Sequence, residues 1–189
     1  SEMCIRDSSK RVTRAVPDGG PIEAHTDLVK KLDYECELAV VLGKDARDVP
    51  AGQTRDYIFG YTILNDVSAR DVQTAHKQWY FGKSLDGFTP IGPCIVTADA
   101  FADYPPRLGI RSFVNGEKRQ DSNTALQIFD IDHVIAELSQ GMTLKAGTII
   151  ATGTPAGVGM GMDPPQFLKP GDVVRCEIDG IGTLTNPVK

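Results

Sequence analysis

Two glutamates in an otherwise apolar stretch are the first residues of this sequence that could do chemistry. Glu35 and Glu37 lie in LDYECELAVVLGK, residues 32–44, which is predicted to form a β-strand. Residues two apart on a strand point to the same side, about 7 Å apart along it, so both carboxylates can converge on one cation. Buried without a cation, they would repel each other and be costly to ionise. The alternative is a half-exposed strand whose glutamates face water, and the strand by itself favours that alternative.

A third carboxylate stands at the end of the next predicted strand. Residues 57–64 form an aromatic and β-branched run typical of a buried strand, and Asn65-Asp66 follow it directly. Asp66 can point inward from there, or it can form only an Asx turn or a helix cap. Three carboxylates without a histidine or cysteine partner are typical ligands of Mg²⁺ or Mn²⁺. Zinc is disfavoured because the three histidines lack ligand spacing: His25, His76 and His133.

Two helices are predicted among the strands that must position these residues. Apolar residues recur with helical spacing from Ile131 to Leu138, with Asp130 or Asp132 as the cap and Gly141 as the stop. A second helix is expected after Ser68 as its cap, and it would place three polar residues on one side: Arg70, Gln73 and Lys77.

The remaining segments predict short strands joined by turns. Residues 82–93 are too rich in Gly and Pro for regular structure and are expected to form a long loop. Asn115-Gly116 predicts a type I′ hairpin turn. Because strands and helices do not alternate, the fold class is α+β, predominantly β, as a sandwich or roll. The further strands are expected over residues 94–97, 108–114, 117 onward, 148–152, 173–178 and 181–184.

Length and composition set the outer limits. A chain of 189 residues predicts one domain, here residues 21–189, after a loose polar tail over residues 1–20 whose opening SEMCIRDS resembles translated sequencing-adapter DNA. A net charge of −5 argues against nucleic acid as a partner, and no apolar run is long enough to span a membrane. Four dispersed cysteines predict buried free thiols in the cytoplasm: Cys4, Cys36, Cys94 and Cys176.

Six segments, in this order, resemble the fumarylacetoacetate hydrolase family, and more narrowly its short acylpyruvate hydrolases, oxaloacetate decarboxylases and hydroxyhepta-dienedioate isomerases. The segments are LDYECELAVVLGK, NDVSARDVQ, GKSLDGFTPIGP, VNGEKRQDSNT, ATGTPAGVG and FLKPGDVVRCEIDGIGTLTN, and the likeness runs from about Leu32 to the C-terminus. It implies a mixed β-sandwich roll, a homodimer, and Mg²⁺ or Mn²⁺ held by Glu35, Glu37 and Asp66. It also implies catalytic roles for four residues: Lys83, Arg70, Gln73 and Thr154.

The resemblance implies a metal-dependent hydrolase that cleaves a C–C bond in 2,4-dioxo acids such as acylpyruvates or fumarylacetoacetate. Oxaloacetate-type decarboxylation and hydroxyhepta-dienedioate isomerisation are the alternatives, because all three reactions can pass through one stabilised enolate. The family's G-x-N-Y-x-x-H-x-x-E segment, which carries a water-activating His and Glu, is not found before Leu32. A protein that binds metal or a 2-oxo acid without turnover is therefore a further alternative.

Overall fold

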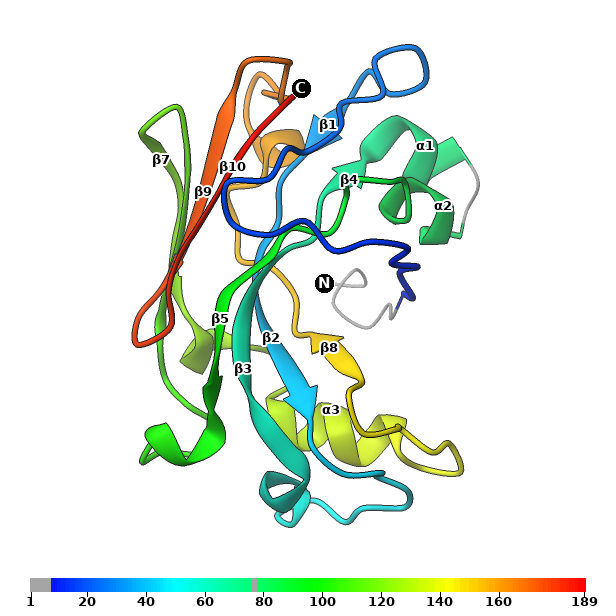
Figure 1. Ribbon diagram of the computed structural model, residues 1–189, viewed down its shortest axis with the longest axis vertical. Coiled ribbons are helices and arrows are strands. Elements are labelled where there is room, and N and C mark those ends of the chain that lie inside the picture. Colours follow the sequence, from blue (N-terminus) through cyan, green and yellow to red (C-terminus); the bar gives the residue numbers. More distant parts are fainter. Residues whose placement is uncertain (1–7, 76–77) are drawn as a thin grey trace.

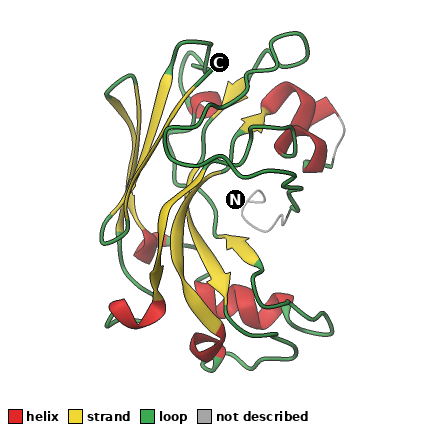
Figure 2. Ribbon diagram, viewed as in Figure 1, coloured by secondary structure: helices red, strands yellow, loops and turns green. Residues whose placement is uncertain are grey.

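The computed structural model describes residues 8–75 and 78–189. Two four-stranded antiparallel sheets form the body of the molecule, and a third, two-stranded sheet lies beside the helices α1 and α2 (Figures 1 and 2). The first sheet has the order β5-β3-β2-β8, with bounds Ile91–Thr97, Ile58–Asn65, Cys36–Leu42 and Ile149–Ala151. The second has the order β10-β9-β6-β7, with bounds Gly182–Pro187, Val173–Ile178, Gly109–Val114 and Glu117–Asn123. The small sheet pairs β1, Leu32–Asp33, with β4, Ser68–Ala69.

The hydrophobic core lies where the two larger sheets face each other. Leu38 and Val40 of β2 are fully buried, as is Ile63 of β3, and from the other sheet Val174 and Leu184 are almost so. Burial alternates along β9 and β10 of the second sheet, which therefore have an inner and an outer side, whereas all seven residues of β2 are buried. The predicted class, α+β with a predominantly β sandwich roll, is confirmed.

Local signals in the sequence placed several elements correctly. The hairpin between β6 and β7 turns at Asn115 and Gly116, which have φ values of 52° and 83°, as a type I′ turn requires. Helix α3, Ile131–Leu138, begins after Asp130, whose side chain accepts a hydrogen bond from the His133 N–H, and Gly141 follows it with a φ of 69°.

Two predictions around the second helix are wrong. Ser68 does not cap α1, Arg70–Ala75, because Ser68 belongs to strand β4 and its hydroxyl donates to the Asp66 carbonyl. The predicted loop over residues 82–93 is in part regular, since α2 covers Tyr80–Lys83 and β5 begins at Ile91. Lys77 lies outside the described residues.

The predicted loose tail is wrong for residues 8–20, which contact the body of the protein. Val16 is 8% exposed, donates to the Thr89 carbonyl and forms a parallel bridge with Pro90. Farther along, Gly19 donates to the carbonyl of Thr185 in β10. A polar segment without periodicity can still be fixed by backbone hydrogen bonds, and such bonds leave no signal in residue type.

Two of the cysteines are the buried free thiols that the sequence predicts, Cys36 and Cys176. Cys94 is free but exposed on β5, so the prediction of burial is wrong there, and Cys4 lies outside the described residues. Burial raises the pKa of the Cys36 thiol, and the neighbouring Cys176 thiol adds to the shift.

Candidate metal and active site

The structure brings three carboxylates together between β2 and the end of β3. One oxygen each from Glu35, Glu37 and Asp66 lies within 4.8 Å of the others, and all three residues are buried. The Asp66 N–H donates to the Glu35 carbonyl at 2.8 Å, which fixes the spacing between the two strand ends. The Asn65 side chain accepts from the Glu35 N–H at 3.0 Å. The alternative in which Glu35 and Glu37 face water is therefore excluded.

The acids of the cluster differ in how much positive charge surrounds them. Burial raises the pKa of Glu37 well above its usual value, and the charges of Asp66 and Glu35 raise it further. The Gly153 N–H donates to Glu37 Oε2 at 2.8 Å and opposes this shift only in part. Burial would also raise the pKa of Asp66, but the ammonium groups of Lys10 and Lys83 outweigh it and lower that pKa. An all-oxygen, buried and charge-deficient set fits a hard divalent cation such as Mg²⁺ or Mn²⁺.

Lys83, at the end of α2, contacts the cluster directly. Its Nζ donates to Glu35 Oε2 at 2.8 Å, to the Ser68 hydroxyl at 3.1 Å and to Asp66 Oδ2. Burial would lower the pKa of Lys83, yet the two carboxylates raise it above its usual value. The three N–H groups of the ammonium thus each have an acceptor, two of them proposed metal ligands. The sequence analysis expected Lys83 in a loop and, from the resemblance, in a catalytic role, and it did not predict these contacts with the carboxylates.

Arg70 joins the cluster to the start of the small sheet. Its Nη1 lies 2.5 Å from Glu35 Oε1, and its Nε donates to Asp33 Oδ2 at 2.9 Å. The same Nη1 donates to Gln73 Oε1 at 3.2 Å, so these two residues share one side of α1. A Cβ at Gly82 would lie 2.6 Å from the Gln73 backbone nitrogen, so only glycine lets α2 pack this closely against α1.

Thr154 lies beside the cluster, but its hydroxyl points to the backbone. It donates to the Cys36 carbonyl at 2.9 Å and accepts from Gln120 Nε2 at 2.8 Å. Its neighbour Gly153 makes the contact with Glu37. Thr154 therefore lies near the three carboxylates, as the resemblance implies, but its catalytic role stays a prediction.

Two residues of the site escaped the sequence analysis. Lys10 Nζ donates to Asp66 Oδ1 at 2.6 Å and to the Val67 carbonyl at 3.2 Å, and no periodicity in its segment could have signalled this. Asp33 is fully buried and accepts from the N–H groups of Gly159 and Met160 as well as from Arg70. Its signal was available, because an aspartate directly before a buried strand segment needs partners.

Neither of the two histidines that the structure describes takes part in this cluster. His25 Nε2 contacts the Asp86 carbonyl, and the His133 ring stacks on Phe129. His76 lies outside the described residues. Among the described residues, no other group of His, Cys, Asp or Glu has the geometry of a metal site.

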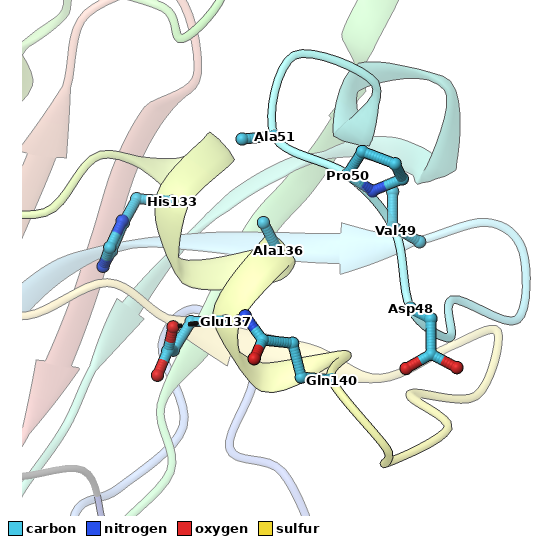
Figure 3. A pocket seen from close by; sticks show the side chains of 8 residues that line it. All are labelled: Asp48, Val49, Pro50, Ala51, His133, Ala136, Glu137 and Gln140. Carbon is cyan, nitrogen blue, oxygen red and sulfur yellow. Dashed lines mark hydrogen bonds between the residues drawn. The ribbon is translucent and has the colours of Figure 1, made fainter.

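A surface pocket between α3 and the loop over residues 48–51, which follows β2, is separate from the cluster (Figure 3). His133 and Glu137 reach it from the helix and Asp48 from the loop, and none of the predicted site residues lines it. The buried carboxylates, and not this pocket, therefore define the candidate site.

Comparison with known proteins shows the family to which the chain belongs. The family model described as "Fumarylacetoacetate (FAA) hydrolase C-terminal" matches residues 8–189. Oxaloacetate tautomerase YisK of Bacillus subtilis is 48% identical over 170 residues, which are 90% of this chain and 56% of that protein. An uncharacterized protein of Staphylococcus saprophyticus is 48% identical over 94% of this chain and 59% of its own length. This chain thus spans less than two thirds of these relatives.

Solved structures of similar proteins have the same fold. A fumarylacetoacetate hydrolase from Exiguobacterium antarcticum has a TM-score of 0.89 and 51% identity, covering 92% of this chain and 62% of that one. A 2-hydroxyhepta-2,4-diene-1,7-dioate isomerase from Mycobacterium marinum has a TM-score of 0.80 and 43% identity, covering 91% and 64%. Within the described residues, no helix is long and apolar enough to cross a membrane.

Proposed function

Because the chain belongs to the fumarylacetoacetate hydrolase family, we propose that it carries a divalent-metal-dependent active site for 2-oxo acids. The observation that carries this proposal is the buried set of Glu35, Glu37 and Asp66, whose oxygens lie within 4.8 Å of one another. A divalent ion, when bound there, would supply the positive charge that polarises a keto oxygen. Mg²⁺ and Mn²⁺ both suit the ligand set.

The cations around the acids suit an anionic substrate. Arg70 contacts Glu35, Lys10 contacts Asp66, and Lys83 contacts both. A substrate carboxylate near the acids would therefore meet these three positive charges. All three N–H groups of the Lys83 ammonium are used in hydrogen bonds. Of their three acceptors, Glu35, Asp66 and Ser68, the Ser68 hydroxyl alone is uncharged. Hydrogen bonds to charged groups are the stronger ones, so we propose that Lys83 exchanges the Ser68 hydroxyl for the substrate anion. It would then stabilise the enolate oxygen as charge develops there.

The reaction proposed first is hydrolysis of a C–C bond in a 2,4-dioxo acid. Water would attack the distal carbonyl, and the bond between the carbonyl carbon and the neighbouring methylene carbon would break. The products would be a carboxylic acid, which keeps the water oxygen, and a pyruvate-type enolate, whose methylene carbon would take up the proton lost by the water. Lys83, and with it Arg70, would hold the negative charge of that enolate. Gln73 keeps Arg70 in place through its Oε1.

Keto–enol isomerisation or decarboxylation on the same site is the second candidate. Two similar proteins carry the names of an oxaloacetate tautomerase and a hydroxyhepta-dienedioate isomerase. Both reactions need the same stabilised enolate but no attack by water on a distal carbonyl. A third candidate, binding without turnover, needs only the metal and the anion.

A substrate panel separates these candidates. Acetylpyruvate, fumarylacetoacetate, and keto and enol oxaloacetate would be followed by absorbance with Mg²⁺, with Mn²⁺ and with EDTA, and pyruvate release would be quantified. Metal-dependent loss of acylpyruvate supports hydrolysis, and faster oxaloacetate interconversion without loss of carbon dioxide supports isomerisation. Glu37→Gln is the control, because it keeps the side-chain size while removing a ligand charge. Activity that is equal in EDTA would exclude the proposed function.

Assembly and location stay predictions. We propose a homodimer in the cytoplasm, as the resemblance to the family and the free thiols suggest. Sedimentation at micromolar concentration would contradict the dimer if it gave only a species of 20.4 kDa.

A further inference from the structure

Gln120, in the middle of β7, has a fully buried amide whose hydrogen-bonding positions are all used. Its Oε1 accepts from the Cys36 N–H at 3.2 Å and from the Ser112 hydroxyl at 2.8 Å. Its Nε2 donates to Thr154 Oγ1 at 2.8 Å and to the Pro155 carbonyl at 2.7 Å. A side-chain amide can make four such bonds, so this one is saturated.

The backbone partners fix which way the amide points. The Cys36 N–H can only donate and the Pro155 carbonyl can only accept, so Oε1 must face Cys36 and Nε2 must face Pro155. Rotating the amide by 180° would place donor against donor and acceptor against acceptor. The connection between β2 and the turn after β8 therefore depends on this one residue type.

Cys36 is the residue between two proposed metal ligands, Glu35 and Glu37. Gln120 holds its N–H, and Thr154, itself held by Gln120, donates to its carbonyl at 2.9 Å. The Gly153 N–H then contacts the Glu37 carboxylate directly. Gln120 thus ties the backbone between the two glutamates to the turn that contacts one of them.

We propose that Gln120 is a positioning residue that sets the relative placement of the Glu35 and Glu37 carboxylates, an inference that rests on the proposed metal site. Its amide touches neither carboxylate and acts through the Cys36 backbone and the 153–155 turn. Without it, the β2 peptide and the turn can shift against each other, and the oxygen set loses its geometry. Residues that orient metal ligands in this way change metal affinity by about 10- to 100-fold when they are replaced.

The test compares Gln120→Met with Ser112→Ala. Methionine keeps the approximate volume of glutamine and removes all four hydrogen bonds, whereas Ser112→Ala removes only one bond to Oε1 and leaves the link to Cys36 and Pro155 intact. Mn²⁺ dissociation constants would be measured by electron paramagnetic resonance at a temperature well below the melting transition of each variant. We expect at least tenfold weaker binding in Gln120→Met and a change of less than twofold in Ser112→Ala, although both melt at a lower temperature.

The outcomes separate this inference from the proposed function. Wild-type protein that binds no Mn²⁺ would overturn both. Tight Mn²⁺ binding by wild type, with unchanged affinity in folded Gln120→Met, would overturn the positioning role alone and leave Gln120 a purely structural residue. If Gln120→Met does not fold, Thr154→Val decides, since it removes the bond to the Cys36 carbonyl and keeps the side-chain shape. Unchanged Mn²⁺ affinity in that variant would likewise overturn the inference.

Discussion

The charged residues on the second sheet and those of the carboxylate cluster differ chiefly in their burial. On the second sheet, Asp121 and Asp179 pair with Arg111, and Lys118 pairs with Asp121. The side chains of Asp121 and Asp179 are 48% and 57% exposed, whereas those of Glu35 and Asp66 in the cluster are each 9% exposed. The same residue types therefore sit in water on one sheet and inside the protein on the other.

Burial changes what the charges do. The exposed group is screened by water, and its carboxylates are free to exchange partners, so it contributes little to stability. In the buried group, four carboxylates, those of Asp33, Glu35, Glu37 and Asp66, meet only three cations among the described residues, Lys10, Arg70 and Lys83. Such an arrangement is destabilising by itself. A site that keeps it is better explained by a ligand that supplies the missing charge.

The largest effect is expected from Lys83→Met. Losing the ammonium leaves Glu35 and Asp66 buried with fewer partners, so the metal-free protein should lose about 3–5 kcal/mol of stability. Saturating Mn²⁺ should restore most of it, because the ion replaces the lost charge. Chemical denaturation without and with Mn²⁺ measures the loss of stability and its recovery. The matched control is Lys118→Met, whose partner Asp121 is exposed. Equal losses of unfolding free energy in Lys83→Met and Lys118→Met would contradict the proposed difference between the buried and the exposed charged residues.

Removing residues 1–20 should also lower stability, by about 2 kcal/mol or more. Val16 is buried, its segment donates to the carbonyls of Thr89 and Thr185, and Lys10 pairs with Asp66. Denaturant titration of the truncated protein measures the loss. Lys10→Met in the full chain measures the share of this stability loss that comes from the Lys10–Asp66 ion pair. Unchanged stability after truncation would instead agree with the loose tail predicted from sequence.

The pH dependence of the metal-free protein should single out Glu37. Burial first, and the neighbouring carboxylates second, raise the pKa of Glu37 in the folded state. The stability that its protonated form contributes is fully present below the ordinary glutamate pKa, about 4.3, and is lost as pH rises from there through the raised pKa. Glu37→Gln stays neutral and should lack this loss. Melting temperatures in EDTA, recorded as a function of pH, check it, and parallel curves for the two proteins would contradict it.

The smallest effect is expected from Asp121→Asn. The pKa of Asp121 is lowered by its hydrogen bond with Lys118, but the carboxylate is exposed, so water screens the pair. The melting temperature should change by less than about 2 °C. Calorimetry measures this change. A drop in melting temperature comparable to that of Lys83→Met would show that solvent exposure does not distinguish the charged residues of the second sheet from those of the buried cluster.

The parts of the fold that were predicted correctly depend on local chemistry. Asn115-Gly116 fixes its turn because both residues tolerate positive φ, and Asp130 starts α3 because its side chain caps an N–H three residues on. The three acids could be grouped because two share a strand side and the third ends the neighbouring strand. These signals lie within a few residues of one another in the chain.

The parts that were missed depend on contacts between distant segments. Lys10 meets Asp66 across 56 positions of the chain, and Gln120 meets Cys36 across 84. Ser68 looked like a helix cap, but pairing of β1 with β4 draws it into a strand. Lys83 was assigned to a loop because residues 82–93 are rich in Gly and Pro, although Gly82 permits the close packing of α2 on α1. No local pattern distinguishes these cases.

Anomalous diffraction at the manganese absorption edge, from crystals grown with Mn²⁺, would show whether the three carboxylates bind a metal ion. We expect one strong peak between Glu35, Glu37 and Asp66, about 2.0–2.3 Å from one oxygen of each. Lys83 would remain beside the ion in hydrogen-bond contact with Glu35 or Asp66. Ordered manganese elsewhere on the protein, with no peak among these three carboxylates, would contradict the proposed metal site.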